Sequence, residues 1–81
     1  MNQDPRPTFR QLCAQHRVYI EEIIGSLPGI PYEEIVRVDS EGIGLPHVID
    51  AMLAELSERT GIRYTRENVG QLSFLPASRE L

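Results

Sequence analysis

The sequence contains no lysine and a single cysteine, Cys13, among its 81 residues. One cysteine excludes an internal disulfide framework and a zinc site built from several cysteines. Because lysine is absent, the glycines Gly42 and Gly44 lack the lysine that follows them in a phosphate-binding loop. No stretch approaches the ~18 to 20 apolar residues that a membrane-spanning helix needs. No secretory signal pattern opens the chain, so we expect a cytoplasmic protein with no membrane association.

Acidic side chains outnumber basic ones by 12 to 8, and the formal net charge is −4. All eight basic residues are arginines. The charge is unevenly distributed: residues 1–20 carry +2, residues 21–58 carry −8 and residues 59–81 carry +2. With 41% apolar residues, a chain of this length can build one packed core and not two. We therefore expect a single small domain with an acidic middle.

Apolar residues recur along most of the chain at the i, i+3, i+4, i+7 spacing of an amphipathic helix. Thr8 and Gln11 form a capping box ahead of the first such segment, and Pro46 opens the longest one. Thr65 and Asn68 indicate the cap of a last, short helix. We therefore expect helices over residues 9–16, 19–26, 31–39, 46–60 and 66–71.

Two alternatives to these helices stay open from the sequence alone. No glycine or proline separates the first two segments, and their apolar stripes stay in register, so one continuous helix over residues 9–26 is an alternative. The β-branched run Ile35-Val36-Arg37-Val38 fits a short strand as well as a helix. We favour the helix, because Pro31 and the glutamates after it are helix-start signals and no partner strand is evident nearby.

The expected fold is all-α, a compact bundle of about five short helices within residues 8–72. Residues 1–7 are expected to form a flexible N-terminal segment, and residues 73–81 a C-terminal tail. The expected core consists of the apolar positions of the helices: Phe9, Leu12, Ile23, Ile24, Leu27, Ile35, Val38, Val48, Ile49, Met52, Leu53 and Leu56.

Two short helices joined by the turn Leu27-Pro28-Gly29-Ile30 have the outline of a helix-turn-helix. Further segments match the pattern of one such family: Phe9 and Leu12, Ile23 and Ile24, Ile35-Val36-Arg37-Val38-Asp39 with Gly42, Met52-Leu53-Ala54-Glu55-Leu56, and residues 65–69. In these residues the chain resembles the Cro/repressor-type, or lambda-repressor-like, helix-turn-helix family. The resemblance covers about residues 8–71. It implies a lambda-repressor-like fold and a DNA-binding transcription regulator, which we expect to be a homodimer.

In that family the helix over residues 31–39 would be the recognition helix. The expected DNA-binding residues lie on this helix and in the basic N-terminal part of the chain: Tyr32, Glu33, Arg37, Arg6, Arg10 and Arg17.

The sequence departs from the family at the positions that read DNA. Ile20 stands where the family usually has a glutamine that touches a phosphate, and Pro31-Tyr32-Glu33-Glu34 replace small polar or basic residues. Glutamates that face phosphates meet like-charge repulsion. A second hypothesis is therefore a degenerate helix-turn-helix fold that acts as an acidic protein-interaction module. Such a module would bind a basic protein partner and not DNA.

Residues with catalytic or metal-binding chemistry do not assemble into a site in this sequence. A reactive Cys13 would need Arg10 and Arg17 to lower the pKa of its thiol, but its place on an apolar stripe favours a buried structural cysteine. Cys13 and His16 have the spacing of two metal ligands, but no second pair completes a site. We find no combination of nucleophile, base and oxyanion site, and we expect neither enzymatic activity nor a metal or other cofactor.

Overall fold

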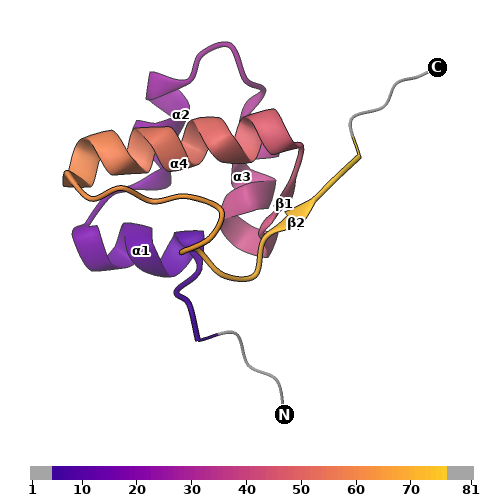
Figure 1. Cartoon of the computed structure of the whole chain (residues 1–81). Coiled ribbons are helices and arrows are strands. Elements are labelled where there is room, and N and C mark those ends of the chain that lie inside the picture. Colours follow the sequence, from indigo (N-terminus) through magenta and orange to yellow (C-terminus); the bar gives the residue numbers. More distant parts are fainter. Residues whose placement is uncertain (1–4, 77–81) are drawn as a thin grey trace.

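Four helices and a short pair of strands make up residues 5–76, the part of the chain that the computed structural model describes (Figure 1). The helices are α1 (Phe9–His16), α2 (Ile20–Ser26), α3 (Tyr32–Glu41) and α4 (Pro46–Thr60). The strands are β1 (Ile43–Gly44), which lies between α3 and α4, and β2 (Ser73–Phe74). The protein is mostly helical, and α4, its longest helix, packs against each of the other three.

α1 begins and ends where the sequence predicts, because its caps are local. The Gln11 amide donates to the Thr8 hydroxyl oxygen at 3.1 Å, and the Thr8 amide donates to the Gln11 side chain at 2.9 Å, which completes the capping box. Arg17 then adopts the left-handed conformation, with a φ of 58°, and its amide donates back to the Ala14 carbonyl. Because Arg17 ends α1, the alternative of one continuous helix over residues 9–26 is wrong.

α2 and α3 each begin one residue later than predicted. Tyr19 and Pro31 are the caps that precede these helices rather than their first residues. Residues 35–38 are helical throughout, so the strand alternative for this segment is wrong. α3 extends to Glu41 and ends at Gly42, whose φ of 74° is a left-handed conformation that glycine adopts without a steric penalty.

The two strands correct the all-α prediction. β1 and β2 pair in parallel, with Gly44 beside Phe74. The Ser73 amide donates to the Gly42 carbonyl at 2.7 Å, and the Leu75 amide donates to the Gly44 carbonyl at 2.8 Å. Strands of two residues have no alternating pattern that a sequence could reveal. The segment predicted as a C-terminal tail therefore starts with a strand, while residues 77–81, like residues 1–4 of the predicted N-terminal segment, lie outside the described residues.

The helix predicted over residues 66–71 is absent from the structure, which has a single turn at residues 66–68 instead. The predicted cap contact does form, because the Thr65 amide donates to the Asn68 side-chain oxygen at 2.6 Å. The helix does not continue, since Val69 enters the core and the Gly70 amide donates to the Pro7 carbonyl at 2.8 Å. A tertiary contact with the N-terminal segment thus replaces the local hydrogen bonds of a short helix.

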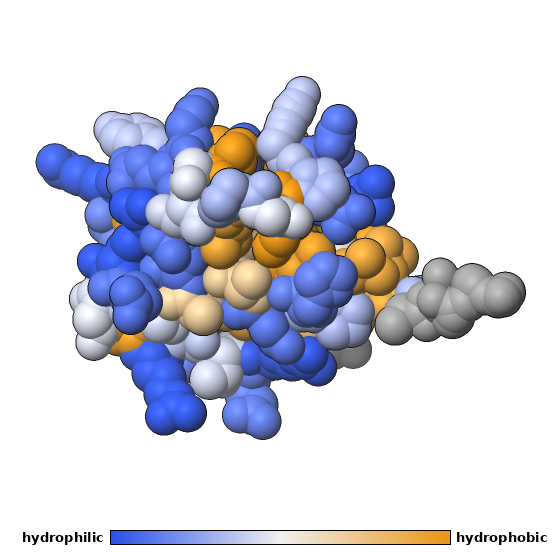
Figure 2. Space-filling model, turned by 90° about the horizontal axis from the view of Figure 1, so that it is seen from above, coloured by the Kyte–Doolittle hydropathy of each residue, from blue (hydrophilic) through white to orange (hydrophobic). Residues whose placement is uncertain are grey.

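The predicted core residues are buried, except that Ile24 and Leu27 are only partly buried and pack at its edge. Cys13, Val18 and Val69 complete the core. The connection between α2 and α3 lies at the top of Figure 1, and the view from above in Figure 2 shows hydrophobic atoms reaching the surface between hydrophilic side chains. Partly buried hydrophobic residues at the edge of the core therefore reach the surface, while the core itself stays buried.

Candidate interaction surface

α3 presents one continuous face to solvent. Its inner side buries Ile35 and Val38, whereas its outer positions follow the i, i+4 spacing of a single helix face. We call this outer face the α3 stripe, which consists of Tyr32, Glu33, Val36, Arg37 and Ser40. Two large hydrophobic side chains stand out in it, because Tyr32 is 53% exposed and Val36 is 40% exposed.

Glu33 and Arg37 place opposite charges one helical turn apart on the α3 stripe. Neither side chain forms an ion pair with any other residue between 5 and 76. Glu33 and Arg37 therefore offset each other within the stripe, and its hydrophobic members lie beside them. The exposed Glu41 and the half-buried Glu34 border the stripe and make α3 as a whole acidic. Surfaces that bind nucleic acid neutralise phosphates with several cations, whereas protein interfaces combine aromatic and apolar residues with polar ones.

The predicted DNA-binding residues do not converge on one surface. Arg10 and Arg17 line a groove formed by α1, α3 and the start of α2, and Asp39 lines the same groove. Arg37 lines a different groove of about 320 Å³ on the other side of α3, where Leu45 and Leu75 are its apolar neighbours. Positions 37 and 39 point about 200° apart on a helix, so these arginines face opposite sides of α3.

The remaining predicted residues divide in the same way. Tyr32 and Glu33 lie on the α3 stripe with Arg37, as the sequence predicts for one helix face. Arg6 contacts a different part of the chain, because its guanidinium donates to the Glu67 carbonyl at 2.9 Å. Three of the six predicted residues thus share a surface, and the N-terminal arginines do not reinforce it.

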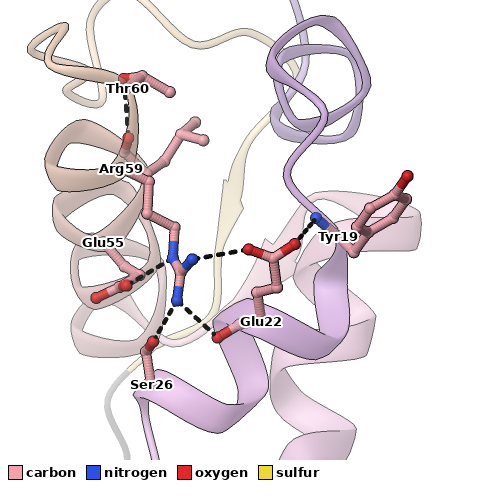
Figure 3. A network of polar contacts seen from close by, with 7 residues as sticks. Tyr19, Glu22, Ser26, Glu55, Arg59 and Thr60 are labelled. Carbon is pink, nitrogen blue, oxygen red and sulfur yellow. Dashed lines mark hydrogen bonds and ion pairs between the residues drawn. The ribbon is translucent and has the colours of Figure 1, made fainter.

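Arg59, near the end of α4, joins α4 to α2 (Figure 3). Its guanidinium donates to the Glu55 carboxylate at 2.8 Å and to the Glu22 carboxylate at 2.8 Å. It also donates to the Glu22 carbonyl at 3.2 Å and to the Ser26 hydroxyl at 2.6 Å. Helical spacing does not reveal these contacts with α2, because their partners lie more than 30 positions earlier in the sequence. This cation is held within the fold.

Arg66 is the second arginine held by a carboxylate. Its guanidinium donates two hydrogen bonds to Asp50, at 2.8 and 2.7 Å, and lies 4.5 Å from the centre of the Phe74 ring. The pKa of Asp50 falls below its usual value, chiefly because of these hydrogen bonds. Arg66 therefore connects α4 to β2 and contributes little free positive charge to the surface.

Cys13 is buried beneath the groove that Arg10 lines, in agreement with the structural role favoured by the sequence. Burial, together with the nearby carboxylate of Asp39, raises the pKa of Cys13 to about 12. The thiol is therefore protonated at neutral pH and is not activated by the arginines. Burial also raises the pKa of Asp39, against the lowering effect of Arg10, whose Nε lies 3.8 Å from the carboxylate.

A contact between His16 and Tyr64 is a further feature that sequence patterns missed. His16 Nε2 and the Tyr64 hydroxyl lie 2.9 Å apart in a partly buried setting, and the two rings meet edge to face. The two residues lie 48 positions apart, which explains the omission, because helical spacing reveals only neighbours three or four positions apart. The pair fixes the chain after α4 against the end of α1.

No group of three or more histidine, cysteine, aspartate or glutamate side chains within residues 5–76 is placed to hold a metal ion. Over the same residues, every helix is too short or too polar to span a membrane. No family model, curated protein or solved structure matches this chain.

Proposed function

We propose that this protein is a protein-interaction module that docks a partner through the α3 stripe, and that it does not read DNA with α3. The composition of the stripe carries the proposal, since Tyr32 and Val36 are exposed hydrophobics and Glu33 offsets the charge of Arg37. Aromatic and aliphatic side chains beside a few charged ones suit a protein partner.

The placement of the arginines supports the same proposal. Arg59 and Arg66 form short ion pairs with carboxylates of this chain, and Arg10 lies 3.8 Å from the Asp39 carboxylate, so part of the positive charge is compensated within the fold. DNA affinity depends on cations that contact phosphates and release counterions, and it weakens when those cations are already paired. Glu33 and Glu34, at the start of α3, would face the phosphates of any groove that α3 entered.

A DNA-binding regulator of the helix-turn-helix type is the second candidate function. One observation favours it, namely that α3 follows α2 through a five-residue connection and leaves a whole face uncovered, as a helix that enters a major groove must. Its contacts would come from Tyr32, Glu33 and Arg37, and the N-terminal arginines would have to reach phosphates from another side.

Titration of a fluorescent duplex of random sequence at two salt concentrations separates the two candidates. For the interaction module we expect binding weaker than the ~10⁻⁴ to 10⁻⁶ M of typical non-specific binders at physiological salt. The double variant Glu33→Gln, Glu34→Gln should bind more tightly, because it removes two negative charges and keeps helix propensity. Micromolar binding by the natural protein, with a steep salt dependence that Arg37→Ala reduces and Arg63→Ala does not, would establish the regulator instead.

The docking face itself is tested by a photo-crosslinking amino acid placed at position 36 and expressed in the native cell. The matched control places the same amino acid at Gln15, which is exposed on α1 outside the α3 stripe. We expect a protein adduct of defined mass from position 36 and none from position 15. Equal labelling from both positions, or nucleic acid as the product at position 36, contradicts the proposal.

A further inference from the structure

We infer that the partner of the α3 stripe is a second copy of this chain, with the two α3 helices packed antiparallel about a two-fold axis. This inference rests on the proposed function and specifies its partner. Such an interface is isologous, so every contact between two different residues occurs twice. A surface forms one only if it is complementary to itself after a two-fold rotation.

The charges of the α3 stripe satisfy this condition. Glu33 and Arg37 are four residues apart, which is about 6 Å along the helix axis. An antiparallel copy whose two-fold axis crosses α3 at the level of residue 35 aligns Glu33 with the other copy's Arg37. The rotation makes the reciprocal pair at the same time. Both side chains are available, because neither forms an ion pair within residues 5–76.

The hydrophobic members of the stripe fall in suitable positions in the same register. Val36 is one residue from the level of the axis, so the two copies of Val36 lie next to each other at the centre. Tyr32 is one turn away, and its ring is placed to cover the centre from each end. The resulting surface has an apolar middle flanked by ion pairs, the usual arrangement of a protein interface.

The order of the two charges within the stripe, and not the net charge of α3, favours a second copy over a strongly basic protein. A basic partner would pair with Glu33 but would bring its positive charges against Arg37, which is exposed on the same face. An acidic partner would meet the converse problem at Glu33. A helix that carries the same two charges in the reverse order can pair with Glu33 and Arg37 together. A second α3 in the antiparallel orientation supplies that order.

Charge exchange tests the register directly, with sedimentation velocity over a dilution series as the measurement. We expect the natural protein to show a concentration-dependent dimer. Glu33→Arg and Arg37→Glu should each raise the dimer dissociation constant by about tenfold or more, since each places like charges opposite one another. The double variant E33R/R37E should restore dimerisation, because it reverses the order of the charges in both copies.

The decisive experiment is to mix the two single variants. The E33R chain presents two arginines on the stripe and the R37E chain presents two glutamates, so each repels its own kind and attracts the other. We expect a one-to-one heterodimer in the mixture, although each variant alone is weakened. A Glu33–Arg37 attraction within one helix cannot produce this result, because mixing restores no intrachain pair. Circular dichroism verifies that each variant is folded.

Three results would overturn the inference: a natural protein that stays monomeric at all concentrations, a dimer unaffected by the single variants, and a mixture that forms no heterodimer. None of them contradicts the proposed function, since a monomer that still crosslinks another protein from position 36 keeps the docking face and identifies a different partner. Tight DNA binding through Arg37 would contradict the proposed function and this inference together.

Discussion

The guanidinium of Arg59 and the carboxylate of Glu22 lie 2.8 Å apart, although the two residues are 37 positions apart along the chain. Arg59 also donates to the Glu22 carbonyl and to Ser26, so one side chain holds both an acidic group and the end of α2. The Glu22 carbonyl has a second lone pair available, so the guanidinium bonds to the backbone as well as to the charged group. The contact ties α4 to the helix that precedes α3.

Arg59→Ala is expected to destabilise the protein by about 1 kcal/mol, more than a typical isolated surface ion pair contributes. The expectation follows from four hydrogen bonds made by one guanidinium that is 29% exposed. Urea denaturation measures the effect. Arg63→Ala is the matched control, since it removes the same charge from an exposed residue after α4. Equal losses in the two variants would show that net charge, and not the network, is responsible.

Gly42→Ala is expected to cost roughly 2 kcal/mol or more, since a Cβ at a φ of 74° is strained and would collide with the Gln71 carbonyl oxygen. Gly25→Ala, in α2, provides the contrast because its added Cβ would meet no atom of residues 5–76 within 4 Å beyond its chain neighbours and the backbone of its own helix. This variant should gain about 0.5 to 1 kcal/mol of stability from helix propensity. Thermal melts of both variants measure the difference. A Gly42→Ala protein as stable as the natural one would contradict the tight approach of Gln71 to Gly42.

Thr8→Ala is expected to lose about 0.5 to 2 kcal/mol, because it removes the hydroxyl that accepts from the Gln11 amide. Thr8→Ser keeps an oxygen at the same place and should lose much less. Hydrogen exchange at the first amides of α1 measures both the size of the effect and its position in the chain. Unchanged protection of these amides in Thr8→Ala would show that the capping box does not hold the start of the helix.

Features that depend on neighbouring residues could be predicted from the sequence. The capping box of Thr8 predicts the start of α1, and Pro46 predicts the start of α4. Helical spacing also identified most of the core, because inward positions repeat with the helical period. The members of the α3 stripe that were predicted to contact DNA do lie on one face for the same reason.

Features that depend on distant parts of the chain could not be predicted. β1 and β2 are too short for a pattern and pair only because the chain returns to Gly42 after about 30 residues. The helix predicted after Thr65 gives way to a contact of Gly70 with Pro7. The division of the arginines between opposite sides of α3 likewise follows from how α1 and β2 pack, which spacing does not reveal.

The pH dependence of stability should carry opposite contributions from Asp39 and Asp50. Burial raises the folded-state pKa of Asp39 above 3.8, so its ionisation destabilises the fold as the pH rises from 3.8 through that higher pKa. Asp39→Asn should therefore raise the melting temperature at neutral pH and leave it unchanged well below pH 3.8.

Arg66 lowers the pKa of Asp50, so Asp50→Asn should destabilise the protein at neutral pH. This loss of stability should disappear as the pH falls below 3.8. Melting curves across this range measure both effects, and an Asp39→Asn protein that is less stable at neutral pH would show that the Arg10 contact outweighs burial.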